Sequence, residues 1–85
     1  MEIVFTPEAI THLSEWQKSG NIAVQKKIQE LLLSIRETPF QGVGKPEALK
    51  HQLSGKWSRR INKEHRIIYA VSDDLIKIYA LKGHY

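Results

Sequence analysis

Apolar residues in the first 38 positions follow the spacing of a short strand and two helices. Residues 2–5 favour a strand, and Thr6-Pro7-Glu8 is typical of a helix start, because it offers a cap, a first-turn proline and an acid at the positive end of the dipole. This helix is expected to end at Ser19-Gly20. A second helix follows the cap Asn21 and ends before Thr38-Pro39, and its apolar stripe consists of Val24, Ile28, Leu31, Leu32 and Ile35. The short connection predicts an antiparallel helical hairpin.

Residues 39–55 lose this regularity. Glycines, prolines and polar residues dominate them and predict a long loop, which in a small domain is often functional. Three strand-like runs follow at residues 56–61, 65–71 and 75–81, and the short polar turns between them indicate an antiparallel meander. The predicted fold class is therefore α+β in the order β-α-α-β-β-β. It forms a single domain over residues 1–85, with the helical hairpin packed on one face of an antiparallel sheet.

Side chains alternate between the two faces of each predicted strand. In the run at 65–71, odd-numbered residues share one face with His65 and even-numbered residues share the other with Arg66. Both faces are apolar, so the pattern does not tell which one the helices cover. Polar side chains gather toward one end of the sheet, at Arg59, Arg60, His65, Arg66, His84 and Tyr85. The last strand is expected to finish at the far end of the middle strand from Arg66, so that His84 reaches Arg66 only if the tail curls back or the loop bridges the gap.

The composition excludes several classes of protein. A domain of 85 residues is too small for a large cofactor pocket, and we expect no cofactor. The sequence has no cysteine, which excludes disulfides, thiolate zinc sites and a cysteine nucleophile. No segment approaches the ~18 apolar residues that cross a bilayer, and the apolar stretch between Glu2 and Glu8 is too short for a signal peptide. We therefore expect a soluble, cytoplasmic protein without membrane contact.

The net charge of +4 is unevenly distributed along the chain. Residues 1–44 carry four Lys/Arg and five Asp/Glu, a balance of −1, whereas residues 45–85 carry nine and four, a balance of +5. A one-sided basic excess favours encounter with polyanions such as RNA. An ordinary solvated surface explains a charge of this size equally well.

The basic half also holds the side chains that RNA cleavage without a metal ion requires. A carboxylate or imidazole takes the 2′-hydroxyl proton, a guanidinium stabilises the phosphorane, and an imidazole protonates the leaving oxygen. The candidates are Glu47, Lys50, Arg59, Arg60, Arg66 and His84, with Tyr85 able to stack on a base. Each also has an ordinary explanation as a solvated charge, a cross-strand ion pair or a frayed chain end. A zinc site from His51, His65 and His84 lacks any recognised spacing.

Two longer motifs resemble a known family. Residues 38–50 have the sequence TPFQGVGKPEALK, residues 53–69 have the sequence LSGKWSRRINKEHRIIY, and the chain finishes with His84-Tyr85. At these spacings the chain resembles the YoeB branch of the RelE toxin superfamily, found in bacterial type II toxin–antitoxin systems. The resemblance covers essentially the whole chain.

The resemblance implies a microbial-ribonuclease-like fold and a toxin that cuts mRNA in the ribosomal A site without a metal ion. Glu47 then matches the general base, His84 the general acid, Arg66 the stabiliser of the transition state and Tyr85 an aromatic that arranges the site. Lys50 and Arg60 match further phosphate-binding positions of the family, and Lys45, Arg59 and Lys82 are additional candidates for RNA or phosphate binding. The implied partners are the ribosome with its mRNA, a YefM-like antitoxin whose flexible C-terminal segment folds onto the toxin, and a second copy in a homodimer.

One departure from the family pattern concerns the tail. The family typically has an arginine and an aromatic residue where this chain has Lys82 and Gly83. Lysine loses the guanidinium fork, and glycine removes a ring and loosens the backbone, which predicts lower activity or altered codon preference.

Two other functions remain open: a toxin of the same fold that inhibits gyrase by binding it, and a non-catalytic RNA-binding or antitoxin-docking module. The set of Glu47, Arg66 and His84 favours the enzyme.

Overall fold

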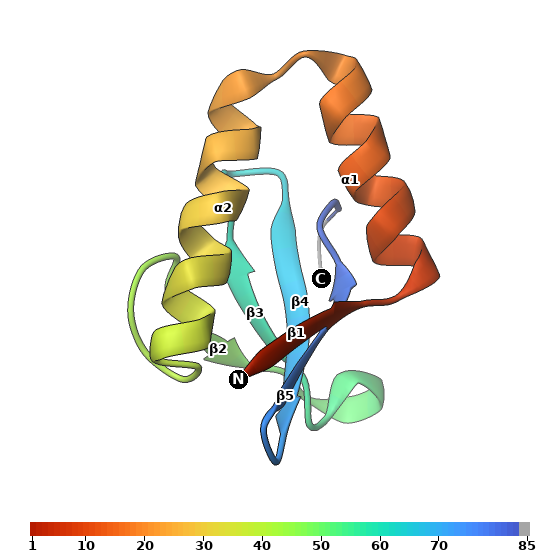
Figure 1. Ribbon diagram of the computed structural model, residues 1–85. Coiled ribbons are helices and arrows are strands. Elements are labelled where there is room, and N and C mark those ends of the chain that lie inside the picture. Colours follow the sequence, from red (N-terminus) through yellow and green to blue (C-terminus); the bar gives the residue numbers. More distant parts are fainter. Residues whose placement is uncertain (84–85) are drawn as a thin grey trace.

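The computed structural model describes residues 1–83 as two helices packed on one face of a five-stranded sheet (Figure 1). Helix α1 (Pro7–Ser19) begins after Thr6, whose side chain caps the first turn, and is followed by a left-handed Gly20. Helix α2 (Ile22–Glu37) begins after Asn21, whose side chain caps it in the same way. These local signals confirm the predicted helical hairpin. Neither helix is long and apolar enough to cross a membrane.

The sheet has the strand order β1-β5-β4-β3-β2. Its members are β1 (Glu2–Phe5), β2 (Glu47–Ala48), β3 (Trp57–Arg60), β4 (Arg66–Ser72) and β5 (Leu75–Ala80). Strands β3, β4 and β5 pair antiparallel, which confirms the predicted meander. The expectation of a wholly antiparallel sheet is wrong, because β1 pairs with β5 in parallel. Helices and three strands separate β1 from β5, so no short turn dictates their relative direction.

The segment predicted as a long loop contains two short elements. Strand β2 adds two residues to the edge of the sheet beside β3, and a single 3-10 turn follows at His51–Leu53. Two residues are too few to show a periodicity in the sequence. Strand β2 nevertheless matters, because it carries Glu47 onto the sheet.

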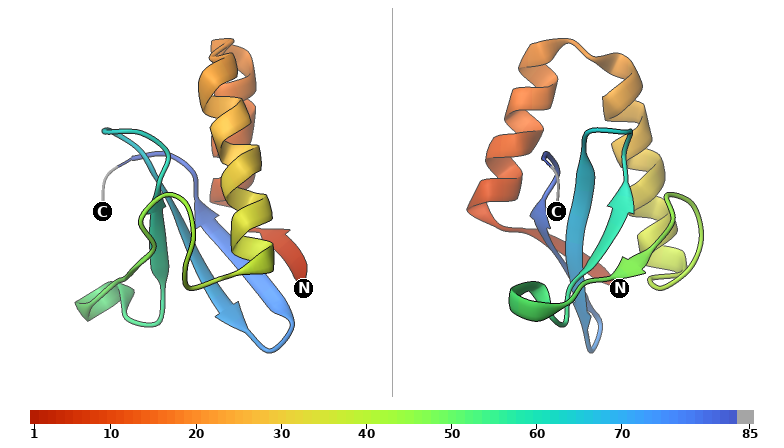
Figure 2. Two further views of the ribbon diagram at one scale, coloured as in Figure 1. Left: turned by 90° about the vertical axis from the view of Figure 1, so that its left-hand side faces the viewer. Right: turned by 180° about the vertical axis from the view of Figure 1, so that it is seen from behind.

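The core lies between the helices and one face of the sheet. Ile67, Tyr69, Ile76 and Ile78 are fully buried on that face. They pack against helical residues that include Trp16, Val24, Ile28, Leu31 and Ile35. The helices therefore cover the face of odd-numbered residues in β4, and Arg66 and Ile68 lie on the other, open face. The left view of Figure 2 shows the helices on one side of the sheet and the 3-10 turn on the other.

The end of β5 lies beside the start of β4, contrary to the expectation from the sequence. Antiparallel pairing sets Ala80 opposite Ile68, and the Arg66 N–H donates a hydrogen bond to the Gly83 carbonyl at 3.1 Å. In a meander the last strand returns toward the start of its neighbour, so no reversal of the tail is needed to approach Arg66.

Candidate functional site

Three side chains meet on the open face where β2, β3 and β4 lie side by side. Arg66 Nη1 lies 3.4 Å from Glu47 Oε1 and donates a hydrogen bond to the Ser58 hydroxyl at 3.1 Å. Ser58 is fully buried and stands opposite Glu47 in the register of β2 and β3. The side chains of Glu47 and Arg66 are 64% and 21% exposed, so the buried serine supports a guanidinium that a ligand can reach. We call these three residues the Glu47 cluster.

The Glu47 cluster unites two of the expected catalytic residues and adds one that the sequence did not indicate. As an ion pair alone, an exposed contact of this length contributes at most about 1 kcal/mol to stability. A carboxylate beside an arginine can instead accept a proton while the arginine binds an oxyanion. The sequence does not indicate Ser58 because its role depends on strand pairing, with β4 for its contact to Arg66 and with β2 for its place opposite Glu47.

A second arginine, Arg60, stands opposite Arg66 in the register of β3 and β4. Like charges directly opposite each other are unfavourable, and a bound phosphate would relieve the repulsion. Arg60 also borders a hollow at the edge of the sheet together with Lys27, Lys45 and Lys63. The structure thus brings the phosphate candidates Lys45 and Arg60 together and adds Lys27 from α2, whose own ion pair with Glu30 spans 3.7 Å.

Arg59 does not have the role expected from the sequence. Its side chain is fully buried on the helix side of the sheet, where RNA has no access. The guanidinium donates hydrogen bonds to the hydroxyls of Tyr69 and Ser34 and to the carbonyls of Thr38, Gln41 and Val43. We therefore correct its assignment from RNA contact to structural residue. The neighbouring arginines look alike in the sequence, but alternation sends them to opposite faces of β3.

Arg59 and Tyr69 fix the loop that leads to Glu47. The Tyr69 hydroxyl accepts a hydrogen bond from Arg59 Nε at 3.1 Å and donates one to the Pro39 carbonyl at 2.6 Å. Gly44, at φ 86°, follows in close contact, because a Cβ there would approach Leu31 Cδ2 to 2.7 Å. The loop therefore packs closely against α2, because the buried Arg59 guanidinium binds its carbonyls and Gly44 has no side chain to keep it away.

Tyr69 gives the fold a dependence on alkaline pH. Burial raises the pKa of Tyr69 above its ordinary value of 10.0, although the hydrogen bond and charge of Arg59 lower it. The unfolded phenol loses its proton more readily, so stability is complete below about pH 10 and falls as the pH rises through the raised pKa. We expect Tyr69→Phe to lose about 1–2 kcal/mol of stability at neutral pH and to show a weaker loss above pH 10 than the unmodified chain. Urea unfolding at several pH values tests this, and parallel pH profiles would contradict it.

Residues 81–83 are tied to α1 and β4 by their backbone. The Trp16 indole N–H donates to the Leu81 carbonyl at 2.8 Å, and the Leu81 N–H donates to His12 Nδ1 at 3.0 Å. The Gly83 N–H donates to His65 Nδ1 at 2.9 Å. The His65 ring also meets Trp16 edge-on, with 4.9 Å between ring centroids. Two imidazoles, those of His12 and His65, thus hold the backbone of residues 81–83 in place.

The expected general acid His84 and its neighbour Tyr85 lie outside the described residues. Gly83, just before them, has φ 101°, a conformation that favours glycine. An aromatic residue at this position, as the family pattern has, would require a different backbone. Glycine in place of the aromatic residue therefore changes the backbone conformation at position 83 as well as removing a ring.

The remaining basic candidates differ in their surroundings. Lys82 pairs with Glu15 of α1 at 3.3 Å, and its ammonium lies 5.4 Å from the centroid of Trp16, so it serves the attachment of the tail. Lys50 is exposed just before the 3-10 turn and follows Leu49, whose N–H donates a hydrogen bond to the Lys56 carbonyl at 2.9 Å. Within residues 1–83, no three His, Cys, Asp or Glu side chains are grouped so as to hold a metal ion.

Comparison with known proteins agrees with the sequence motifs. A family model described as a YoeB-like toxin of bacterial type II toxin-antitoxin systems matches residues 5–85. The chain is 49% identical to Toxin YoeB of Escherichia coli (strain K12) over 85 residues, which cover 100% of both proteins. Two solved structures from Staphylococcus aureus, a YoeB-YefM complex and a YoeB dimer, are 46% and 45% identical, with TM-scores of 0.89 and 0.90. Each match covers 100% of this chain and 98% of the other. Motifs, fold and relatives together place this chain in the family of YoeB-like toxins of bacterial type II toxin–antitoxin systems.

Proposed function

We propose that this toxin is a ribosome-dependent endoribonuclease that cleaves mRNA in the A site and so stops translation. One observation carries the proposal: the Glu47 carboxylate lies 3.4 Å from the Arg66 guanidinium on the open face of the sheet. One scissile phosphate can therefore meet a base and an oxyanion-binding group at once. Membership of the YoeB-like toxins supports the ribosomal substrate that the sequence resemblance implies. Because the proposed substrate is mRNA on translating ribosomes, the proposed location is the cytoplasm.

The reaction follows from the roles of the individual groups. Glu47 accepts the proton of the 2′-hydroxyl as the 2′-oxygen forms its bond to phosphorus. Arg66, held by Ser58, stabilises the negative charge that gathers on the phosphoryl oxygens. His84 donates a proton to the 5′-oxygen as the bond from phosphorus to that oxygen breaks. The products are a 2′,3′-cyclic phosphate and a 5′-hydroxyl, and the base and acid have exchanged one proton each with the RNA.

Phosphates on either side of the cleaved bond need cations that do not take part in the chemistry. Arg60 and Lys45 border the edge hollow beside the Glu47 cluster, and Lys50 follows β2 on the same segment as Glu47. We assign these three to the phosphate backbone. Tyr85 is assigned to arranging the site beside His84, as the family pattern has it.

The proposed acid His84 follows Gly83 directly in the sequence, which predicts an effect of His65, because His65 Nδ1 accepts the hydrogen bond of the Gly83 N–H. His65→Phe keeps a ring against Trp16 but removes the acceptor of the Gly83 N–H, whereas His65→Asn keeps an acceptor close to the position of Nδ1. We expect His65→Phe to cleave about 10- to 100-fold more slowly, because small misplacements of a catalytic group are costly, and His65→Asn to restore most of the rate. Cleavage rates and urea unfolding are measured for both variants. Equal losses in both would show that the hydrogen bond to the tail is irrelevant.

The proposed partners are a YefM-like antitoxin and a second copy of the toxin. The YoeB of Staphylococcus aureus forms a complex with YefM and has been solved as a dimer, and this chain is 46% and 45% identical to those chains. The open face with its exposed cations suits a flexible antitoxin segment that folds on binding.

Two assays separate this function from the alternatives. The purified chain is added to a translation extract and, separately, to DNA gyrase acting on relaxed plasmid. We expect translation to stop with shortened mRNA, supercoiling to continue, and Glu47→Gln to relieve the block of translation. Inhibited supercoiling would favour the gyrase-binding alternative. A block of translation that persists in Glu47→Gln would favour the non-catalytic module.

A further inference from the structure

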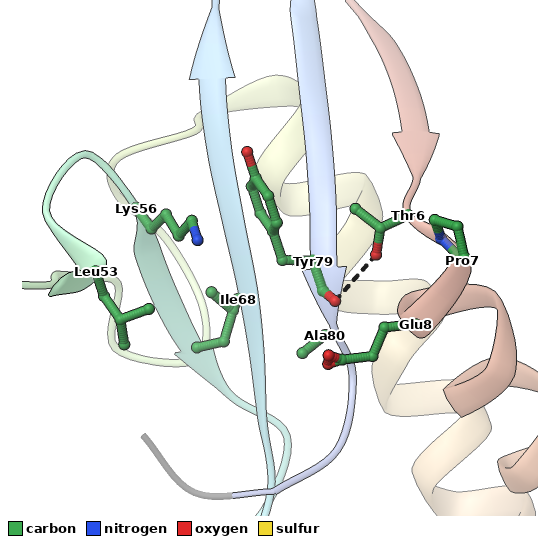
Figure 3. Close-up of a pocket in the computed structure, with 8 residues that line it drawn as sticks. All are labelled: Thr6, Pro7, Glu8, Leu53, Lys56, Ile68, Tyr79 and Ala80. Atoms are coloured by element: carbon green, nitrogen blue, oxygen red, sulfur yellow. Dashed lines mark hydrogen bonds between the residues drawn. The ribbon is translucent and has the colours of Figure 1, made fainter.

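The open face carries a second concave feature beside the Glu47 cluster. It lies between the N-terminus of α1 and the 3-10 turn and has a volume of about 330 Å³ (Figure 3). Its floor is apolar, since Ile68 and Ala80 are each 2% exposed. Around this floor stand Thr6, Pro7, Glu8, Leu53, Lys56 and Tyr79. We call this feature the Tyr79 hollow.

A bulge in β5 creates the hollow. Ile68 pairs with Ala80 and Tyr69 pairs with Ile78, so that Tyr79 is an extra residue without a partner in the register. Bulges turn side chains away from regular alternation and are frequent next to active sites. The Thr6 hydroxyl donates a hydrogen bond to the Tyr79 carbonyl at 3.1 Å and holds the bulge in place (Figure 3). As a result, Tyr79 and its neighbour Ala80 both line the same hollow.

The Tyr79 ring has the surroundings of a site for an unpaired base. The ring is half-buried and lies on the face opposite the core, so it does not serve the packing of the helices. Lys56 Nζ lies 4.2 Å from its centroid and Lys77 Nζ 5.4 Å. Proteins that bind single-stranded nucleic acid combine such aromatic platforms with cations that follow the backbone. A cation–π contact that only stabilises the fold would not explain why an apolar hollow lies beside the ring.

The Tyr79 hollow is one short step from the proposed reaction centre. Ile68, part of its floor, follows Arg66 by two residues on the same face of β4, and it stands opposite Ser58 in β3. Two residues of a strand span about 6.7 Å, which is close to the repeat of an extended RNA strand. A phosphate held by Arg66 therefore leaves a neighbouring nucleotide over the hollow.

We propose that the Tyr79 hollow binds an unpaired RNA base next to the scissile phosphate, with the base against Tyr79 and its phosphate beside Lys56. This inference rests on the proposed function, because it takes Arg66 as the contact to the scissile phosphate. It adds a substrate subsite whose aromatic residue, Tyr79 in β5, lies outside both family motifs. Selection of the base in this hollow would contribute to the sequence preference of cleavage.

The test is a binding cycle with an RNA that cannot be cut. A labelled RNA tetranucleotide whose 2′-hydroxyls are replaced by fluorine, which removes the nucleophile, and a series that also has one abasic position each are titrated against the full chain and Tyr79→Ala. We expect one abasic position to weaken binding to the unmodified chain about tenfold, the order expected for one stacked base, and to have almost no effect on Tyr79→Ala. Tyr79→Phe, which keeps the ring, should behave like the unmodified chain. Equal sensitivity of all three proteins to every abasic position, or no binding of the RNA at all, would overturn the proposal.

A matched pair of lysine variants guards against a general effect of charge or folding. Lys56→Gln and Lys77→Gln remove the same charge from the same ring, but only Lys56 lines the hollow. We expect Lys56→Gln to weaken binding severalfold more than Lys77→Gln, and equal losses would count against the hollow. Cleavage of mRNA on ribosomes by the unmodified chain is recorded in parallel. If ribosomal mRNA is cleaved but the abasic effect does not depend on Tyr79, only the subsite is refuted. If the abasic effect depends on Tyr79 but mRNA is not cleaved, only the proposed catalysis is refuted.

Discussion

Substitution of Arg59 by alanine is expected to destabilise the fold by about 3–5 kcal/mol, because each buried acceptor left without a donor costs on the order of 1–3 kcal/mol. The guanidinium uses five hydrogen bonds to join Tyr69 and Ser34 to the loop carbonyls of Thr38, Gln41 and Val43. A loss of this size is a large part of the total stability of a small domain, about 5–15 kcal/mol. Arg59→Lys should also be strongly destabilising, since one ammonium cannot reach acceptors on both sides of the fork.

Arg60 is the matched control for this prediction. It is the next residue on the same strand, it has the same side chain, and it is exposed. We expect Arg60→Ala to change the free energy of unfolding by no more than about 0.5 kcal/mol and to weaken RNA binding instead. Urea unfolding followed by tryptophan fluorescence compares the two variants. Similar midpoints for Arg59→Ala and Arg60→Ala would refute the structural role of Arg59.

Removal of either charged member of the Glu47 cluster is expected to abolish most of the cleavage. Glu47→Gln and Arg66→Ala should each slow the reaction about 10²- to 10⁴-fold, the range for a general base or a group that stabilises a developing oxyanion. The double variant should be only slightly slower than the worse single variant, because both groups act on one transition state. Glu47→Gln should change stability by less than about 1 kcal/mol, since its carboxylate is exposed. Arg66→Ala also leaves the buried Ser58 hydroxyl without its donor and should cost about 1–3 kcal/mol.

Another ion pair controls for the loss of charge as such. Lys27 and Glu30 lie 3.7 Å apart on α2, and their side chains are 36% and 57% exposed. Glu30→Gln removes a carboxylate from α2 and leaves Lys27 in place at the edge hollow, and we expect cleavage to stay within twofold of the unmodified rate, as for an ordinary surface substitution. Single-turnover rates on ribosome-bound mRNA give the comparison. Glu47→Gln with the activity of Glu30→Gln would remove Glu47 from the mechanism.

The helices were predictable because their signals are local. Thr6 and Asn21 lie within a few residues of the N–H groups that they cap, and the stripe from Val24 to Ile35 shows its period directly. The parallel pairing of β1 with β5 and the short strand β2 were not predictable in this way. Both depend on contacts between distant segments, and β2 has only two residues.

For the site, the motifs selected residues that lie together, but they did not show which face of the sheet each side chain occupies or where the last strand ends. The motif match selected Glu47 and Arg66, and the structure places them 3.4 Å apart. Arg59 was a candidate from its residue type alone. Its acceptors come from the end of α2, the loop that follows and β4, so its burial could not be inferred from strand alternation in two apolar faces. His12 is separated from Leu81 by 69 positions, and no pattern in the sequence links them. The misplaced end of the last strand was an error of topology, because antiparallel pairing already brings it to Arg66.

The central claim is cleavage of A-site mRNA by attack of a 2′-hydroxyl, with Glu47 as the base. The direct test uses ribosomes stalled on a message with one 2′-deoxynucleotide at successive positions of the A-site codon, followed by mapping of the fragment ends. The proposed function predicts that an all-ribose message is cut to a 2′,3′-cyclic phosphate and a 5′-hydroxyl. It also predicts that a deoxynucleotide blocks cleavage only at the position whose hydroxyl attacks. Cleavage at the bond that follows a deoxynucleotide, or an intact all-ribose message, would contradict it.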